Sequence, residues 1–190
     1  MSPATTLAGA FQDDPLFSWV QPDPERRRSG LLPVFRAVVR RCAALGGVVD
    51  IDEGGGVATW LPAQRAPVGP VDLLRFGMLG APRWLGPTGA VRLVRHDATA
   101  DPLIERHAGP GDAYLWALGA DPHRRGQGLG RRAVQECVGR AAEAGSSRLL
   151  LKTENPANVP LYEHLGFHVV DQHDVAVSGL TVWVFARQTS

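Results

Sequence analysis

Residues 124–131 read Arg-Arg-Gly-Gln-Gly-Leu-Gly-Arg, and this stretch carries the most information about fold and function. It follows an apolar run, Tyr114–Leu118, and opens an amphipathic segment over 129–144. A glycine-rich turn between a strand and a helix exposes backbone N–H groups, and the helix dipole adds positive potential there. Glycines permit close approach, and arginines supply forked donors suited to phosphate. The stretch is therefore typical of a site that binds a diphosphate.

The spacing of these glycines argues against two common nucleotide sites. A dinucleotide fold has Gly-x-Gly-x-x-Gly, but here the glycines lie at 126, 128 and 130, and Arg131 takes the last glycine position. A P-loop ends in Gly-Lys-Ser/Thr, and the only lysine of the chain is Lys152. Glycine-rich surface turns often bind nothing, and at this point that alternative stays open.

The composition is that of an ordinary globular protein. A length of 190 residues, with 44% hydrophobic and 21% charged residues, suits a single domain over 1–190. The net charge of +1 provides no overall attraction for nucleic acid. Cys42 and Cys137 stand far apart in apolar contexts, which predicts buried thiols and neither a disulfide nor a metal site. The absence of a long apolar run predicts a cytoplasmic protein with no membrane partner.

The first half of the chain predicts helices around one hairpin. A helical period over 25–45 places Leu31, Phe35 and Val38 on one stripe, and Pro33 predicts an interruption of that helix. The other predicted elements are helices over 5–11, 71–79 and 87–104, and strands over 48–51 and 57–61 joined by a loop.

The second half predicts a strand–helix–strand unit over 113–120, 129–144 and 149–151. Strands joined in this way are parallel and covered on both faces. A short helix over 159–165 and a final antiparallel pair over 167–177 and 181–187 complete the pattern. The predicted fold class is α/β (mixed α+β), with a central mixed sheet and helices on both faces.

A second motif follows the second parallel strand. Residues 155–167 read Asn-Pro-Ala-Asn-Val-Pro-Leu-Tyr-Glu-His-Leu-Gly-Phe, with Tyr162 in the short helix. Ligands of such sheets bind beyond the carboxyl ends of the parallel strands. The glycine-rich turn follows one of these strands and Asn155 follows the other, so both motifs are expected to face one cleft.

Together the two motifs resemble those of the GNAT acetyltransferases. Arg125, Gly128 and Gly130 match Arg-x-x-Gly-x-Gly, and 161–167 reads Leu-Tyr-Glu-x-Leu-Gly-Phe, in the family's order and separation. The resemblance is clearest over 112–167. Ala10-Phe11-x-x-Asp-Pro and the strand at 57–62 are similar to the branch that contains puromycin N-acetyltransferase. The resemblance implies a GNAT-like fold whose parallel pair is splayed around the acyl-CoA arm.

The resemblance also implies acetyl-CoA as co-substrate, without a metal. Tyr162 is then expected near the thioester sulfur as the general acid, because a phenol of pKa about 10 can protonate a thiolate whose acid has a pKa of about 8.5. The alternative is a purely structural buried tyrosine. A backbone N–H near Gly119 or Ala120 is expected to bind the developing oxyanion. The cofactor-binding residues implied are Leu118, Gly119, Ala120, Arg125, Gly126, Gln127, Gly128, Leu129, Gly130, Arg131, Asn155 and Asn158.

The general base is not identified by the resemblance. Many family members carry a glutamate where this chain has Trp116, which cannot accept a proton. The candidates are Glu105, His107, Asp112 and Glu154, with His96 and His123 ranked below them. A chain of water molecules, or direct capture of the free-base amine, is also open.

The leading functional hypothesis is acetyl transfer to a primary amine of a small molecule. The alternatives are transfer to a protein or peptide amine, and a non-catalytic acyl-CoA sensor. The acceptor site is expected between the N-terminal helices and the final hairpin. Residues 1–7 suit a full strand poorly, so a free sheet edge and a homodimer are further possibilities. Six aromatic residues are available to line the acceptor pocket, although at least half are expected in the core: Phe17, Trp19, Trp60, Trp84, Trp116 and Trp183.

Overall fold

The structure, a computed structural model, describes residues 1–189. Its centre is a six-stranded sheet in the order β1-β2-β3-β4-β6-β5, in which only β3 and β4 are parallel neighbours. The mixed α/β fold class is as predicted. The strands are β1 Gly47–Ile51, β2 Gly56–Pro62, β3 Ala113–Ala120, β4 Arg148–Thr153, β5 His168–Val175 and β6 Leu180–Gln188.

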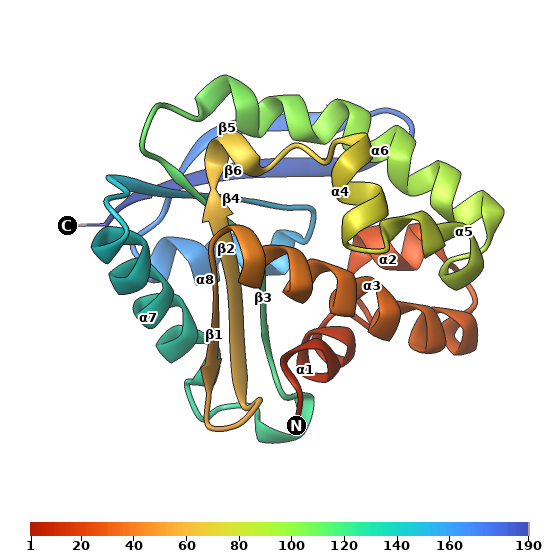
Figure 1. Cartoon of the computed structure of the whole chain (residues 1–190), viewed down its shortest axis with the longest axis horizontal. Coiled ribbons are helices and arrows are strands. Elements are labelled where there is room, and N and C mark those ends of the chain that lie inside the picture. Colours follow the sequence, from red (N-terminus) through yellow and green to blue (C-terminus); the bar gives the residue numbers. More distant parts are fainter. Residues whose placement is uncertain (190) are drawn as a thin grey trace.

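Helices cover both faces of this sheet. Figure 1 shows α7 on one side of the sheet and α1 and α3 on the other, with α6 across the far end of the strands. No helix of the described residues is long and apolar enough to cross a membrane. The helices are α1 Pro3–Ala10, α2 Pro15–Val20, α3 Pro24–Leu45, α4 Pro70–Arg75, α5 Ala81–Trp84, α6 Pro87–His107, α7 Leu129–Glu143 and α8 Val159–His164.

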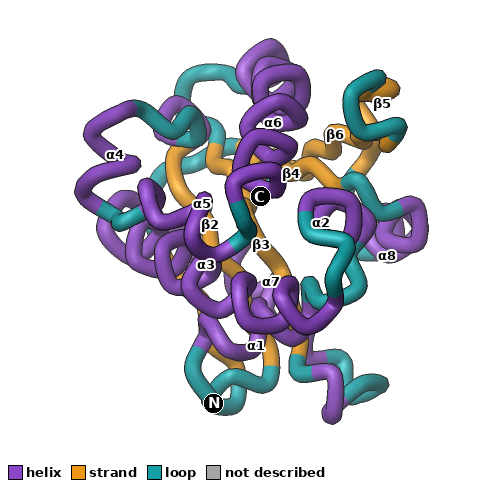
Figure 2. The backbone as a smooth tube through the Cα atoms, turned by 90° about the vertical axis from the view of Figure 1, so that its right-hand side faces the viewer, coloured by secondary structure: helices purple, strands orange, loops and turns teal. Residues whose placement is uncertain are grey.

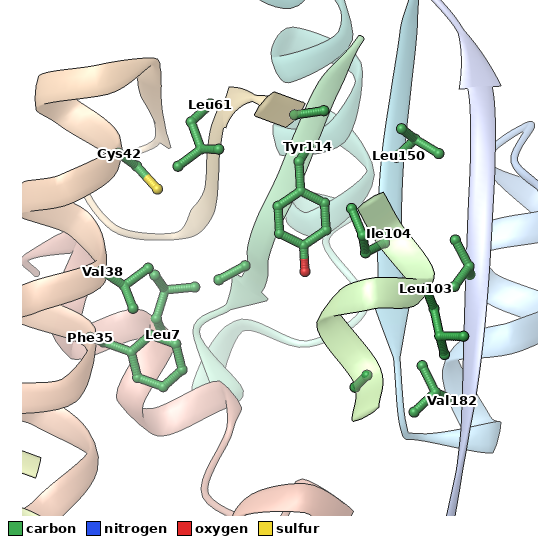
Figure 3. Close-up of a cluster of buried hydrophobic side chains, with 14 of the residues drawn as sticks. Leu7, Phe35, Val38, Cys42, Leu61, Leu103, Ile104, Tyr114, Leu150 and Val182 are labelled. Atoms are coloured by element: carbon green, nitrogen blue, oxygen red, sulfur yellow. The ribbon is translucent and has the colours of Figure 1, made fainter. Parts of the chain in front are cut away.

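Two hydrophobic clusters lie on the two faces of the sheet, and a third, smaller one joins Leu16 and Val20 of α2 to Leu85. Of the first two, one lies between the sheet and α1, α3 and α6, and the other lies between the sheet and α7 and α8. In Figure 3 the ring of Tyr114 projects from β3 between Phe35 and Val38 of α3 and Leu103 and Ile104 of α6. Each fully buried side chain of this size contributes roughly 1.5–3 kcal/mol to folding.

Helix α3 begins and ends at recognisable caps. The carboxylate of Asp23 accepts hydrogen bonds from the backbone N–H of Glu25 (2.9 Å) and Arg26 (3.1 Å), and Gly46 ends the helix. The predicted interruption at Pro33 was wrong, because the helix runs unbroken through it. Proline inside a helix costs about 3 kcal/mol, and the buried stripe around Leu31 and Phe35 outweighs that cost.

Two other helices differ from their predicted bounds. The helix expected over 71–79 divides into α4 and a single 3-10 turn, Met78–Gly80, because Gly77 adopts a φ of +76° between them. Helix α6 extends to His107, beyond the predicted end at Ile104. Its docking onto the sheet is partly polar: Lys152 Nζ of β4 lies 2.7 Å from Asp101 Oδ1 and 3.4 Å from Asp97 Oδ1.

The parallel pair separates soon after it forms. Only Ala113 with Leu149 and Tyr114 with Leu150 are paired between β3 and β4. Next along β3 is a bulge at Trp116, since Thr59 of β2 faces Ala117 whereas Trp60 faces Leu115. A bulge bends its strand. Figures 1 and 2 both show β4 diverging from β3, which leaves one edge of β3 unpaired toward its carboxyl end.

Candidate active site

The loop after β3 presents a row of unpaired backbone N–H groups. Gly126 and Gly128 have φ angles of +79° and +67°, a conformation in which a β-carbon is disfavoured. The first helical bond of α7 runs from Arg132 N–H to the Gly128 carbonyl (3.0 Å). Among the described residues, no acceptor binds the backbone N–H groups of 125–131. We call this loop and helix start, residues 125–131, the cradle.

The space above the cradle is open. A β-carbon placed at Gly126, Gly128 or Gly130 would meet no other atom within 4 Å. The predicted cofactor residues Arg125, Gln127 and Arg131 are exposed, whereas the side chain of Leu129 is buried in the core and offers only its backbone. A helix start with free N–H groups binds anions well.

An acidic residue fixes two of the arginines around the cradle. Arg132 NH1 and NH2 lie 2.8 and 3.1 Å from the Asp52 carboxylate, and Arg124 NH2 lies 3.4 Å from it. The hydrogen bond from Arg132 is the main reason that the pKa of Asp52 falls below its usual value. Arg124 and Arg132 are thus partly neutralised, which leaves Arg125 and Arg131 as the main source of positive charge.

The free edge of β3 adjoins the cradle. Asp121 N–H donates to the Gly55 carbonyl of the β2 side (2.9 Å), and peptide groups alternate in direction along a strand. The peptide groups of Leu118 and Ala120 therefore face the side of β4, whereas that of Gly119 faces β2. Gly119 has a packing role, because a β-carbon there would lie 2.8 Å from Ala10 Cβ. Of the three predicted strand residues, Leu118 and Ala120 have peptide groups on the edge of β3 that β4 leaves unpaired.

Tyr162 is buried but keeps its hydroxyl free. The side chain is 7% exposed, and its ring packs against Phe167 (5.8 Å between centroids) and Phe185 (5.5 Å). No hydrogen bond to the described residues occupies the hydroxyl. Burial, together with the negative charges of Asp14 and Glu154, raises the pKa of Tyr162 above its ordinary value. The phenol therefore stays protonated at neutral pH, and it is a weaker acid than an ordinary tyrosine.

Asn155 and Asn158 shape the turn that positions Tyr162. Asn155 Oδ1 accepts a hydrogen bond from the backbone N–H of Ala157 (3.0 Å). Asn158 Nδ2 donates to Thr153 Oγ1 at the end of β4 (3.2 Å). Both side chains thus have structural roles, and the amide nitrogen of Asn155 makes no hydrogen bond within the described chain.

Three of the predicted base candidates lie at the wrong end of the sheet. Glu105, His107 and Asp112 precede Ala113, the first residue of β3, whereas the cradle follows its last residue. An eight-residue strand spans roughly 25 Å, so they cannot reach an acceptor beside Tyr162. Asp112 is also fully engaged by Arg148 (2.6 Å) and the Gly109 N–H (2.7 Å). Asp171 likewise occupies His107 (2.9 Å).

Of the remaining candidates, Glu154 lies near Tyr162, and His96 contacts Glu154. Glu154, a predicted candidate, directly follows β4 and is 8% exposed. His96 of α6 is fully buried, with Nε2 at 3.3 Å from Glu154 Oε1. The signal for His96 was its place on the buried stripe of α6, seven residues after Gly89 and four before Ala100. His123, ranked with it, is exposed.

Asp14 was missed entirely. It caps α2, accepting a hydrogen bond from the backbone N–H of Leu16 (3.0 Å). Burial and the charge of Glu154 raise the pKa of Asp14 to about 6, with Leu16 among the groups that oppose the rise. An Asp-Pro pair is typical of a helix start, so the sequence pattern indicates only that Asp14 is a helix cap. It gives no sign that Asp14 lies close to Glu154.

A surface groove of about 560 Å³ opens beside this cluster. It is bounded by Trp19 of α2, by residues 87–95 of α6 and by Val177 of the β5–β6 turn. The groove thus lies between an N-terminal helix and the final hairpin, where the acceptor site was predicted. Of the predicted aromatic lining only Trp19 takes part. The other five pack against the hydrophobic clusters: Phe17, Trp60, Trp84, Trp116 and Trp183.

Comparisons with known proteins agree with this geometry. Residues 85–167 match the model of the acetyltransferase (GNAT) family. A protein named as an uncharacterized N-acetyltransferase of Schizosaccharomyces pombe is 24% identical over 175 residues, covering 86% of this chain and 68% of that protein. The mycothiol acetyltransferase of Kocuria rhizophila is 36% identical over 67 residues, which cover 32% of this chain and only 22% of that protein.

A solved structure extends the likeness over nearly the whole chain. An agmatine N-acetyltransferase in its apo form aligns with 96% of this chain and 90% of its own, with a TM-score of 0.59 and 16% identity, which shows a shared fold. Residues 85–167 thus match the GNAT family of acetyltransferases, and the comparisons together support an acyltransferase.

Proposed function

We propose that this protein transfers an acetyl group from acetyl-CoA to a primary amine of a small molecule. The observation that carries the proposal is the cradle, where unpaired backbone N–H groups face open space at the start of α7. A diphosphate suits this site, because it accepts several such hydrogen bonds and its charge is favoured by the helix dipole. One sheet joins strands from both halves of the chain, so we propose a single domain as well.

Each part of the site has a distinct task in this proposal. The cradle holds the diphosphate of the co-substrate, and the free peptide groups of Leu118 and Ala120 bind its extended arm. Acetyl-CoA supplies the activated acetyl thioester. Tyr162 donates its hydroxyl proton to the sulfur that leaves, which its free and protonated hydroxyl permits. An N–H of the unpaired β3 edge polarises the thioester carbonyl.

A small acceptor is favoured over a protein. The groove at Trp19 and Val177 has a volume of about 560 Å³, which is in the range of small-molecule sites. Of the proteins described above, one is named for agmatine and one for mycothiol, and both are small molecules. A peptide acceptor and an acyl-CoA sensor are the competing functions.

The decisive experiment incubates the purified protein with acetyl-CoA and a panel of primary amines, and follows the release of free thiol. We expect turnover with at least one small amine and none with peptides. Release with peptides alone supports the protein-directed alternative, and tight CoA binding without release supports the sensor.

The placement of the cradle has its own test. The substitution Gly128→Glu puts a side chain and a negative charge into the open space, and we expect CoA binding to be lost by calorimetry. Gly139→Glu on the same helix is the matched control, since Gly139 also has free space around it and lies outside the cradle. Equal affinity in the two variants would refute the placement.

A further inference from the structure

The hydrogen bonds around Ser178 fix the orientation of His96. Ser178 Oγ donates its only proton to the Val175 carbonyl (3.2 Å) and accepts a bond from the Leu180 N–H (3.3 Å). His96 Nδ1 lies 3.0 Å from the same oxygen. With the hydroxyl proton on the Val175 carbonyl, we assign the proton of this contact to His96 Nδ1, which then donates to Ser178 Oγ.

This tautomer determines whether the other ring nitrogen, Nε2, carries a proton toward Glu154. With Nδ1 protonated, a neutral His96 directs the lone pair of Nε2 at Glu154 Oε1, which is 3.3 Å away and also carries lone pairs. That contact is attractive only when a proton lies between the two atoms. His96 is fully buried and Glu154 is 8% exposed, so little water relieves the repulsion in the unprotonated state.

Charges of both signs surround the pair. Burial raises the pKa of Glu154, but the hydrogen bond with His96 and the charge of Lys152 outweigh it and keep that pKa below its ordinary value, so the carboxylate is ionised and can accept a proton. The titratable groups around the pair are Asp14 of the α2 cap, Asp97 and Asp101 of α6, Lys152 of β4, and the phenols Tyr114 of β3 and Tyr162 of α8.

We propose that Glu154 and His96 form one proton-accepting pair that removes a proton from the ammonium group of the acceptor. This inference rests on the proposed function. Glu154 is the catalytic residue, because it follows β4 at the open end of the splayed strands. His96 is a positioning residue that shares the proton, and Ser178 fixes its tautomer. The pair thus acts as the general base, a role that Trp116 cannot perform because its indole does not accept a proton.

The step is balanced without any further reactant. An N–H bond of the acceptor ammonium breaks, its electron pair stays on nitrogen, and the proton comes to lie between Glu154 Oε1 and His96 Nε2. The neutral amine is then able to attack the thioester carbonyl. The proton afterwards leaves to water through Glu154, since Glu154 is the more exposed member of the pair.

The test compares two acceptors with wild-type protein and Glu154→Gln. One acceptor is an alkylamine that is protonated at neutral pH, and the other is an aromatic amine or hydrazide that is already neutral. General-base catalysis typically contributes about 10²–10⁴-fold. We expect Glu154→Gln to lower kcat/KM for the alkylamine by about 100-fold, and to leave that of the neutral amine within a factor of about 3, because that acceptor has no ammonium proton to lose.

Two further measurements separate catalysis from structure. We expect kcat/KM for the alkylamine in Glu154→Gln to rise with pH only as the free amine forms, up to the alkylamine's own pKa, whereas the wild-type value levels off at lower pH. His96→Gln should show a weaker form of the same selective loss. Asp171→Asn is the control, since it weakens another polar contact of α6, the one between His107 and Asp171 of β5, and it is expected to preserve both rates. An equal loss with both acceptors in Glu154→Gln would overturn the inference and leave only a structural role. If the wild-type protein acetylates no amine, the proposed function itself fails.

Discussion

The backbone conformation favours glycine at positions 126 and 128, whereas at position 130 glycine serves only to keep the space above the helix open. The first two adopt positive φ angles, and Gly130 lies in the first turn of α7 with ordinary helical geometry. This difference is invisible in the sequence, where the three glycines form one regular pattern. Because of this difference, substitutions at the glycines are expected to change stability in different directions while all of them affect binding.

The substitutions Gly128→Ala and Gly130→Ala are therefore expected to differ in sign. Gly128→Ala should lower the free energy of unfolding by about 1 kcal/mol, because alanine resists the left-handed conformation. Gly130→Ala should raise it by about 0.5–1 kcal/mol, since alanine is the better helix former. Both should weaken CoA binding by filling the open space. Urea unfolding and calorimetry on both variants check this, and a destabilised Gly130→Ala would contradict it.

A second residue-scale prediction concerns the two tyrosines of the chain. Tyr162→Phe removes the free hydroxyl, and we expect kcat to fall by about 100-fold or more while CoA affinity is unchanged. Tyr114→Phe is the matched control, because that phenol projects into the hydrophobic cluster under α6 and should not alter turnover. Comparable activity in both variants would remove Tyr162 from the role of general acid.

At the scale of elements, the amino ends of β3 and β4 are held by a buried ion pair. Arg148 NH2 lies 2.6 Å from Asp112 Oδ2, and Asp112 is 2% exposed. Burial alone would raise the pKa of Asp112, but the hydrogen bonds from Arg148 and the Gly109 N–H keep it below its usual value. The same two strands diverge at their other ends, so this pair is a fixed point of the splayed sheet.

We expect Asp112→Ala to lower the free energy of unfolding by about 3 kcal/mol at pH 7, because it leaves Arg148 without its buried partner. A depressed carboxyl pKa stabilises the folded state above the unfolded pKa, and this contribution is lost as pH falls through the folded value. The difference between variant and wild type should accordingly shrink below about pH 4. Urea titrations at pH 7 and pH 3 measure it, and an undiminished difference at pH 3 would count against this account.

The elements themselves were largely predictable. The period over 129–144, the apolar run at 113–120 and the hairpin at 47–62 depend on local pattern, and each formed within a few residues of its expected bounds. Both halves of the candidate site were also found by their motifs. Asp14 and His96 escaped this reasoning because their roles depend on the docking of α2 and α6 beside Glu154. A side chain's distant neighbours are set by packing, and the local pattern around Asp14 indicates only a helix cap.

At the scale of the whole molecule, β1 pairs only with β2 and thus forms one edge of the sheet. No strand of the described residues precedes α1, in line with the expectation for residues 1–7. A homodimer through a free edge stays a prediction, and elution as a monomer from a sizing column would contradict it.

The dependence of stability on pH is also a property of the whole molecule. Burial is the main cause that raises the pKa of Asp14 and of Asp97 to about 6 each. A carboxyl whose folded pKa is raised favours folding while protonated, so the free energy of unfolding should fall as pH rises from about 4 to about 6. Asp14→Asn should flatten this decline, as followed by urea midpoints at pH 5 and pH 7. An unchanged slope in the variant would show that Asp14 is ionised in the fold at both values.

The single lysine has a consequence for the chemical durability of this enzyme. Thioesters acylate neutral lysine amines without any catalyst, whereas guanidinium groups do not react in this way. Lys152 is 11% exposed and held as a cation between Asp97 and Asp101, and all other cationic side chains apart from histidine are arginine. A protein that handles an acetyl donor throughout its lifetime thereby presents almost no side-chain amine to it. After prolonged incubation with acetyl-CoA, mass spectrometry is expected to find any adduct at the terminal amine of Met1 and none at Lys152.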